Sequence, residues 1–352
     1  MKPQIRSEYN GKGYVYAASA EETAKKTGIT RIARLASNEN PYPPSPELVS
    51  AAVSALTAVN RYPDPSAAKL REVIRRTVCD APVVVSGSGM DGVIETVFRV
   101  IVNPNDKVVI STPTFSVYGL TAKSVSAKIV TVPRERNFSV DVDKFIAEAK
   151  DAKLSFICSP NNPTGTVTPA DDIEKILQNI SGFLFLDCAY IEFAEEDYSR
   201  LLKYDNLIIG RTLSKVYGLA GLRIGYAFVP EWFVGPYMAA VTPFSLNCVS
   251  EAAGIAALSN ADDKDGFVAY VKAERKKFFE EIPFPVVPSG ANFVLFDTAP
   301  MKSDEAVAKF AEMGVLVRSC SSFPGLGDTF VRVSIGDTWE NERFLSAVNK
   351  LC

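Results

Sequence analysis

The chain has 352 residues, 47% of them hydrophobic, and 38 basic against 41 acidic residues give a net charge of −3 at pH 7. This length and composition allow a large core and predict two domains. The chain has no basic run or basic-aromatic patch and no long apolar stretch, which argues against nucleic acid and membrane as partners.

The first 40 residues predict an N-terminal arm that packs on another part of the chain. Residues 1–34 are polar with scattered tyrosines, and only 20–26 has a helical pattern, which ends near Gly28. The stretch 35–46 is too rich in proline for a regular element. It is either a linker or a loop that lines a site through its polar side chains.

Residues 83–186 predict strands that alternate with helices, after a helix at 47–58. Short β-rich runs lie at 83–85, 107–110, 128–132, 154–158 and 183–186. Helical stretches lie near 91–102, 114–123, 141–149 and 169–179. This alternation predicts an α/β fold with a mostly parallel central sheet flanked by helices.

After Trp232 the pattern becomes richer in helices. Helices are predicted at 246–258, 262–281, 303–313 and from 338 onward, with strands at 292–296, 315–317 and 329–333. We therefore predict three parts: an N-terminal arm over 1–40, a large domain over 41–260 and a smaller α+β domain over 261–352. We expect the arm to join the smaller domain.

The residue types that are missing restrict the chemistry. The chain contains no histidine, which excludes serine-histidine triads, cysteine-histidine pairs and histidine-based zinc sites. General acid-base catalysis must then use lysine, tyrosine or carboxylates. The six cysteines show no C-x-x-C spacing, so we expect free thiols and no metal. The N-terminal residues lack the apolar segment of a signal peptide, which predicts a cytoplasmic protein.

Residues 87–92, Gly-Ser-Gly-Met-Asp-Gly, follow a predicted strand and begin a helix, so they match the G-x-G-x-x-G pattern. A dinucleotide site would also need an acidic residue at the end of the next strand, where Ser111 and Thr112 stand. An NAD(P)-dependent oxidoreductase is the alternative from a different class. A glycine-rich helix start also suits other phosphates, because its N–H groups and the helix dipole favour an anion.

Two later strand ends carry polar residues. The segment 159–165, S-P-N-N-P-T-G, follows the strand at 154–158 and fits either a tight turn or a site loop. Asp187 follows the apolar strand at 183–186, and Tyr190 comes three residues later. Such an aspartate can cap a helix, lie on a loop, or keep a pyridinium nitrogen protonated.

Lys215 lies between two apolar stretches, 207–210 and 224–229, that predict buried strands. Ligands of open α/β sheets bind at such strand ends. Partial burial, or a nearby cation such as Arg223, lowers the pKa of a lysine amine and lets it form a Schiff base with an aldehyde. Pyridoxal 5′-phosphate (PLP) is an aldehyde cofactor of this kind.

The motifs S-P-N-N-P-T-G, D-x-A-Y, T-L-S-K and G-L-R-I-G-Y, in this order, resemble the fold-type I PLP-dependent aminotransferases over nearly the whole chain. L-A-S-N-E-N-P-Y, R-Y-P-D and V-R-V-S-I-G are similar to the histidinol-phosphate aminotransferase branch. The resemblance implies a cytoplasmic homodimer of histidine biosynthesis with the PLP-dependent transferase fold. The implied ping-pong reaction converts histidinol phosphate and 2-oxoglutarate into imidazole acetol phosphate and glutamate.

The resemblance also implies a role for each matching residue. Lys215 would carry PLP as a Schiff base and shuttle a proton from the substrate Cα, while Asp187 would pair with the pyridine nitrogen. Asn162 and Tyr190 would hydrogen-bond the phenolic oxygen of PLP, and Phe115 would stack on its ring. The PLP phosphate would be held by Gly89, Met90, Thr212, Ser214, Arg223 and Tyr62 of the partner subunit.

For the substrate, the resemblance implies that Arg332 clamps the α-carboxylate with its planar guanidinium. Arg318 and Tyr16 would hold the substrate phosphate, and Asn38 would border the substrate. The chain departs from the family pattern at Cys188, where glutamate is usual, and at 90–92, where S-D-E is common. Alternatives within the fold are an aminotransferase for aromatic or other amino acids and a threonine-phosphate decarboxylase.

Overall fold

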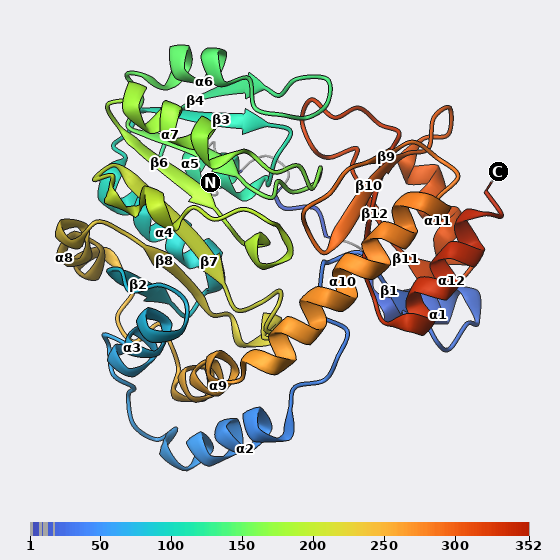
Figure 1. Ribbon diagram of the computed structural model, residues 1–352, viewed down its shortest axis with the longest axis horizontal. Helices are drawn as coiled ribbons and strands as arrows, with labels where there is room; N and C mark the ends of the chain where they lie inside the picture. The colour runs from blue at the N-terminus through green and yellow to red at the C-terminus, as the bar shows by residue number, and fades with distance from the viewer. Residues whose placement is uncertain (1–2, 7–8, 10–12, 17, 352) are drawn as a thin grey trace.

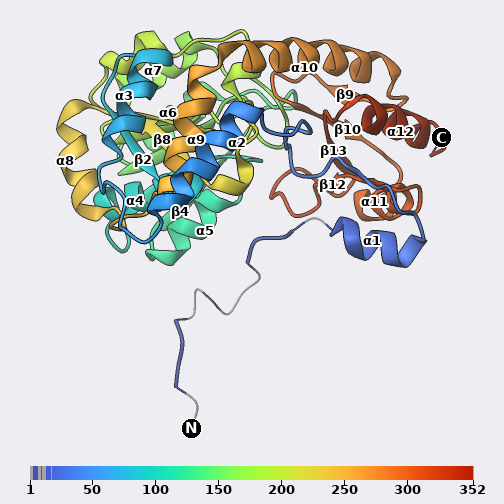
Figure 2. The same ribbon diagram turned by 90° about the horizontal axis from the view of Figure 1, so that it is seen from below.

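The computed structural model describes residues 3–6, 9, 13–16 and 18–351. A large sheet from the middle of the chain and a small sheet from its C-terminal part organise these residues (Figure 1). The long helix α10 (Ala261–Glu281) runs from the helices of the large sheet to the small sheet (Figure 2). The two sheets therefore face each other across a junction that α10 bridges.

The large sheet has seven strands in the order β2-β8-β7-β6-β5-β3-β4. Neighbours are parallel, except that β8 runs antiparallel to both β2 and β7. The strands are β2 (Val83–Ser86), β3 (Lys107–Thr112), β4 (Lys128–Pro133), β5 (Leu154–Cys158), β6 (Phe183–Asp187), β7 (Leu207–Thr212) and β8 (Gly225–Phe228). Strands covered on both faces need apolar residues throughout, which explains why the central strands are nearly continuous apolar runs.

Helices cover both faces of the large sheet and bury two separate hydrophobic clusters. One cluster involves α2 (Pro46–Ala55), α3 (Ala68–Thr77), α6 (Val142–Ala149), α7 (Ala170–Asn179) and α9 (Cys248–Ser259). The other involves α4 (Gly89–Ile101), α5 (Val117–Ser124) and α8 (Glu231–Ala240). This arrangement confirms the predicted α/β fold with a mostly parallel sheet between two helical layers.

The small sheet is antiparallel, in the order β12-β13-β10-β9. Its strands are β9 (Val286–Val287), β10 (Phe293–Asp297), β12 (Arg318–Ser319) and β13 (Phe330–Ser334). Helices α10, α11 (Ser303–Glu312) and α12 (Thr338–Val348) share one hydrophobic cluster with β10 and β13. Helix α12 begins with a capping box between Asp337 and Glu340, which satisfies backbone N–H groups at the helix start.

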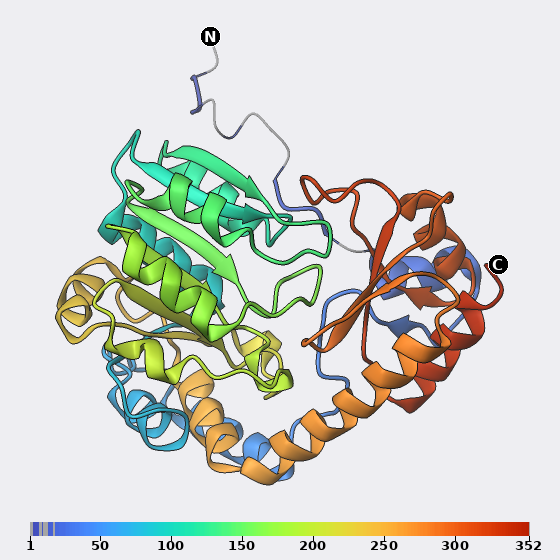
Figure 3. The same ribbon diagram turned by 45° about the horizontal axis from the view of Figure 1, so that its top comes forward.

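The N-terminal segment packs against C-terminal elements and forms a separate two-stranded sheet with one of them. Strand β1 (Ala33–Arg34) pairs in parallel with β11 (Val315–Leu316), and α1 (Ala20–Thr27) packs on α11. In Figure 3 these blue N-terminal elements lie beside the red strands and helices of the C-terminal part. The pairing holds residues 35–40 at the junction of the two sheets.

Two helices escaped the sequence prediction. Helix α8 contains Pro236 in its interior, a residue that normally breaks a helix, and α3 begins after a left-handed residue without a side-chain cap.

The predicted strand at 315–317 is divided between β11 and β12, which belong to different sheets. The domain boundaries at residues 40 and 260 stay predictions. Within the described residues, no helix is both long and apolar enough to cross a membrane.

Candidate active site

A cavity of about 920 Å³ lies at the junction of the two sheets. It is lined by residues that follow β5, β6 and β7, by the N-terminal segment and by β12 and β13. The carboxyl ends of neighbouring parallel strands meet at one edge of a sheet, so side chains that follow them converge there. All residues predicted for the site line this cavity except Gly89 and Tyr62.

Lys215 lies on the connection between β7 and β8 and is half-buried. Its Nζ donates to the backbone oxygen of Ser37 at 3.2 Å and lies 5.6 Å from the centre of the Tyr190 ring. Burial, followed by the positive charge of Arg332, lowers the pKa of the amine to about 8. Near neutral pH a useful fraction of the amine is therefore uncharged and able to act as a nucleophile or a base.

Asp187 is the last residue of β6, and its carboxylate is buried. One oxygen accepts a hydrogen bond from the Tyr118 hydroxyl at 2.5 Å, and the other accepts from the N–H of Ala189 at 3.0 Å. Burial raises the pKa of Asp187 to about 6, although both hydrogen bonds favour the charged form. Both donors are neutral, so the carboxylate has no positive counter-charge from them. A protonated ring nitrogen beside it would supply that counter-charge.

Tyr118 was missed by the sequence analysis. It is fully buried, stacks on Phe156 with ring centres 4.7 Å apart, and contacts the predicted ring-stacking residue Phe115 edge to face at 5.7 Å. Tyr118 lies in the first turn of α5, whereas Phe115 precedes that helix, so no helical spacing in the sequence pointed to their contact.

Among the described residues, no group accepts from the side-chain donors of Asn162 and Tyr190, the predicted partners of a phenolic oxygen. Tyr190 accepts a hydrogen bond from Asn38 Nδ2 at 3.1 Å, which leaves its own hydroxyl proton free. Asn162 accepts through Oδ1 from a guanidinium N–H of Arg332, which leaves its amide N–H groups free. Both residues line the cavity.

The predicted phosphate subsite lies at the start of α4. The hydroxyl groups of Thr212 and Ser214 are 2.9 Å apart, and the half-exposed Arg223 contacts Asp91 at 3.2 Å. The helix start, the Ser214 hydroxyl and the guanidinium supply donors of the kind that hold a phosphate, whereas the Thr212 hydroxyl donates within the protein, to Ser214 Oγ or to the backbone oxygen of Ile224. The N–H of Gly89 is not among them, because it donates to the backbone oxygen of Arg223 at 2.8 Å.

Arg318 and Arg332, the residues predicted to bind the substrate, form a pair of buried cations beside the cavity. They are register partners on β12 and β13 and are only 8% and 5% exposed. Burial lowers the pKa of Arg318. In the described part of the chain, neither guanidinium forms an ion pair with a carboxylate. Buried charges without a counter-charge are costly, which favours an anionic ligand beside them.

On the arm, Tyr14 rather than Tyr16 contacts Arg318. The guanidinium carbon lies 5.9 Å from the centre of the Tyr14 ring. Tyr16 is 81% exposed at the rim and meets Tyr14 edge to face at 5.1 Å. The course of the arm decides which tyrosine reaches the arginine, and no sequence pattern fixes it.

Tyr62 lies away from the cavity of its own chain. Its side chain is 82% exposed, and its ring stacks on Phe244 at 4.6 Å. The predicted contact of Tyr62 with a partner's cofactor stays a prediction.

The topology of β2 argues against a dinucleotide site at 87–92. A dinucleotide fingerprint belongs to a strand inside a parallel βαβ unit. Here β2 is an edge strand, antiparallel to β8 and separated from β3 by four strands. The alternative of an NAD(P)-dependent oxidoreductase is therefore wrong. The described residues also contain no cluster of three or more His, Cys, Asp or Glu side chains that could hold a metal.

Comparisons with known proteins show to which family the chain belongs. The family model described as Aminotransferase class I and II matches residues 30–348. Histidinol-phosphate aminotransferases from Methanocorpusculum labreanum and Methanoculleus marisnigri are 62% and 53% identical, over 100% of both chains in each case. The crystal structure of histidinol-phosphate aminotransferase from Sinorhizobium meliloti in complex with pyridoxal-5′-phosphate has the same fold, with a TM-score of 0.88 at 24% identity over 100% of this chain and 98% of that one. This chain belongs to the class I and II aminotransferases.

Proposed function

We propose that this aminotransferase moves the amino group of histidinol phosphate to 2-oxoglutarate, giving imidazole acetol phosphate and glutamate in a ping-pong cycle. Two relatives with full coverage and 62% and 53% identity are histidinol-phosphate aminotransferases. The structural observation that carries the proposal is the buried pair of Arg318 and Arg332.

The two guanidinium groups match the charges of both substrates. Histidinol phosphate carries a phosphate and no carboxylate, while 2-oxoglutarate carries two carboxylates. Both compounds are therefore dianionic acceptors of guanidinium hydrogen bonds, which are strong because they are charge-assisted. A substrate with a single carboxylate and an apolar side chain would leave one of the two buried cations without a partner.

PLP is the cofactor of this family, and the residues of this chain fit it. Asp187 is a buried carboxylate with only neutral donors, which suits a protonated ring nitrogen. Asn162 and Tyr190 retain donors, and Lys215 has an amine with a lowered pKa. When bound, PLP supplies an electron sink that stabilises negative charge at the substrate Cα.

Lys215 is the base that this arrangement offers for the proton of the substrate Cα. With its pKa lowered to about 8, the amine is near the value at which proton transfer at neutral pH is most efficient. Arg318 and Arg332 would orient the substrate by its anionic groups. The same lysine would return the proton in the second half of the cycle.

We also propose that the enzyme is a cytoplasmic homodimer with shared active sites. Tyr62 is exposed and lies outside its own cavity, and the nearby apolar residues Leu56 and Val59 are also exposed. An apolar surface of this kind is typical of an interface. The test is to mix inactive Lys215→Ala and Tyr62→Ala proteins under conditions that exchange subunits. Recovery of activity supports shared sites, and no recovery in proven mixed dimers rejects them.

A screen of amino donors tests the substrate. The PLP-loaded enzyme is given histidinol phosphate, aromatic amino acids or threonine phosphate, and both the visible absorbance of the cofactor and glutamate formation from 2-oxoglutarate are followed. We expect the highest kcat/KM with histidinol phosphate and a large loss of it in Arg318→Ala. A preference for aromatic donors, or release of CO2 from threonine phosphate, would overturn the proposal in favour of one of the two alternatives.

A further inference from the structure

Three buried residues from three parts of the chain form a line of hydrogen bonds that ends at Tyr190. Ser334 is the last residue of β13 in the small sheet, Asn38 lies in the N-terminal segment, and Tyr190 follows β6 of the large sheet. Ser334 and Asn38 are each 1% exposed, and Tyr190 is also buried. The line therefore joins the two sheets through the N-terminal segment.

The donors and acceptors at Ser334 fix the direction of the first two hydrogen bonds. The backbone N–H of Asn38 donates to Ser334 Oγ at 2.8 Å, so this oxygen acts as an acceptor there. Its single proton then goes to Asn38 Oδ1 at 3.0 Å. The two contacts together place the side-chain oxygen of Asn38 toward Ser334 and its amide N–H groups toward Tyr190.

This direction has a consequence for the Tyr190 hydroxyl. Asn38 Nδ2 donates to the hydroxyl oxygen at 3.1 Å, so Tyr190 does not donate in return. Across the described residues, the structure gives the Tyr190 proton no acceptor of its own. Burial raises the pKa of Tyr190, which keeps this proton in place at neutral pH. The proton is thus available to a ligand in the cavity that Tyr190 lines.

Contacts to the small sheet hold Asn38 in the orientation that points its amide N–H groups toward Tyr190. Its φ of 55° is in the left-handed region, which asparagine tolerates better than most residues. Its backbone oxygen accepts from Asn292 at 3.2 Å, and the backbone of Leu35 accepts from the N–H of Ser334 at 2.9 Å. The segment that carries Asn38 is therefore fixed on the small sheet.

We propose that Ser334 is a positioning residue that acts through Asn38 to direct the Tyr190 hydroxyl proton to the phenolic oxygen of bound PLP. Ser334 itself does not line the main cavity. The small sheet, which carries the substrate-binding arginines, would then also set the electronic state of the cofactor. This inference rests on PLP as the cofactor and is independent of the identity of the amino donor.

The test follows the pH midpoint of the visible absorbance band of the bound cofactor and the PLP dissociation constant in Ser334→Ala. A donor to the phenolic oxygen favours its anionic form, so loss of a well-directed donor raises the pH midpoint. A hydrogen bond worth about 0.5–1.5 kcal/mol corresponds to a rise of about 0.4–1 pH unit. By the same measure, the PLP dissociation constant rises by about 2–10-fold. Ser334→Thr keeps the hydroxyl and should restore both values.

The matched control is Thr298→Val, which also removes a buried hydroxyl near the small sheet. Thr298 Oγ1 donates to the backbone oxygen of Thr329 at 2.6 Å and does not line the cavity. We expect this variant to lose some stability without a change in the pH midpoint. An equal shift in Thr298→Val would assign the effect to general loosening of the small sheet and overturn the proposal.

A double-mutant cycle with Tyr190→Phe decides whether Ser334 acts through Tyr190. If it does, Ser334→Ala produces no further shift once the Tyr190 hydroxyl is absent. A shift of the same size in the Tyr190→Phe background, or a folded Ser334→Ala with the parental midpoint and PLP affinity, contradicts the proposal. If Ser334→Ala does not fold, Asn38→Asp is the second test, because it replaces the donor toward Tyr190 by an acceptor. This variant should raise the pH midpoint of the cofactor band. The rise should be smaller when Tyr190→Phe is also present. Failure of histidinol phosphate as a donor would leave all these outcomes unchanged.

Discussion

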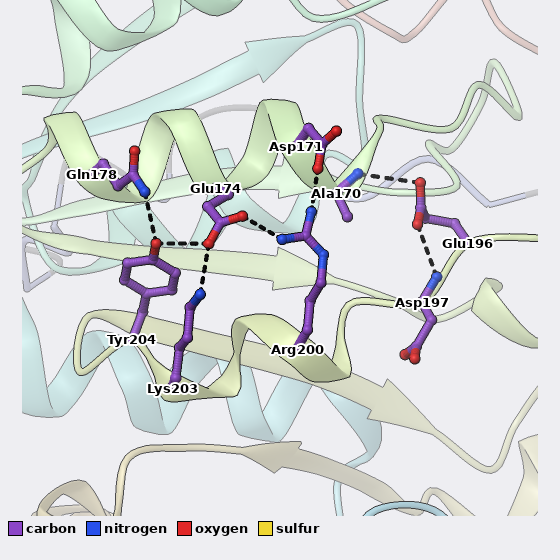
Figure 4. Close-up of polar contacts among 9 residues, drawn as sticks. All are labelled: Ala170, Asp171, Glu174, Gln178, Glu196, Asp197, Arg200, Lys203 and Tyr204. Carbon is purple, nitrogen blue, oxygen red and sulfur yellow. Dashed lines mark hydrogen bonds and ion pairs between the residues drawn. The ribbon is translucent and has the colours of Figure 1, made fainter.

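In two groups of charged residues in this chain, the surroundings shift the pKa values in opposite ways, away from neutrality in one group and toward it in the other. On the surface, Glu174 of α7 binds Arg200, Lys203 and the Tyr204 hydroxyl, and Arg200 also binds Asp171 (Figure 4). Contacts from Lys203, Arg200 and Tyr204 lower the pKa of Glu174 to about 2.

In the cavity, burial moves pKa values toward neutrality instead. The pKa of Asp187 rises to about 6 and that of Lys215 falls to about 8. Glu174 is thus fully charged at every physiological pH. We expect its group to contribute to stability and not to catalysis. The cavity groups can exchange protons near neutral pH, which catalysis requires and which costs stability.

The largest expected effect is on the amine itself. Lys215→Ala removes the proposed nucleophile and base, so we expect a loss of kcat of at least about 10³-fold and a changed visible spectrum with PLP. Lys203→Ala, which removes a lysine of the surface group, should retain the parental kcat. A kcat of Lys215→Ala within tenfold of the parental value would mean that the cavity lysine is no more important for turnover than the surface lysine.

Asp187→Asn has the next largest expected effect, because it removes the charge of the proposed partner of the PLP ring nitrogen at nearly constant shape. We expect a loss of kcat of about 10²–10³-fold, as for other preorganised electrostatic contacts, and weaker PLP binding. Asp171→Asn, in the surface group, is the control and should leave both quantities unchanged. Full PLP affinity and turnover in Asp187→Asn would show that the buried charge has no role.

Removing the buried amine should stabilise the cofactor-free protein. The folded pKa of Lys215 lies below its usual value, so the unfolded chain binds more protons between pH 8 and 10.5. The cost of burial is full below pH 8 and disappears as the pH approaches 10.5. Lys215→Met should therefore raise the free energy of unfolding by about 1–3 kcal/mol at pH 7. Urea unfolding at pH 7 and 10 measures this gain, and a gain that does not shrink at pH 10 would not come from the charge.

The smallest effect is expected for Glu174→Gln. The pKa of Glu174 is lowered in the folded protein, so its contribution to stability is present above about pH 4.5 and is lost as the pH falls toward 2. We expect a slight decrease of the melting temperature at pH 7, no difference from the parent near pH 2, and unchanged kcat. A change in kcat would mean that the surface group reaches the active site.

The sequence predicted for a physical reason that most of the proposed cofactor-binding residues would lie together, as they do in the cavity. Lys215, Asp187 and Asn162 each follow a strand of one parallel sheet, and the carboxyl ends of such strands converge. Strand prediction and motif order were then sufficient to place these residues together. The same reasoning predicted the two helical layers, apart from α3 and α8.

The residues that support the site were harder to predict. Tyr118 donates to Asp187 from the first turn of α5, and Ser334 comes two residues after Arg332 on the same face of β13. The second spacing was visible in the sequence, but only the structure shows which partners these two residues meet. The contact of Tyr14 depends on the course of the arm, and the role predicted for Tyr62 involves a second subunit, so neither follows from strand order.

The pKa of the Lys215 amine in the cofactor-free enzyme tests most directly whether the cavity makes this amine able to exchange protons near neutral pH. It can be measured by NMR of reductively ¹³C-methylated protein, with the Lys215 resonance assigned by its absence in Lys215→Arg. We expect a midpoint near pH 8 for Lys215, well below the ordinary lysine value of about 10.5. A midpoint near the ordinary value of about 10.5 would contradict it, because the buried amine would then be fully charged at neutral pH.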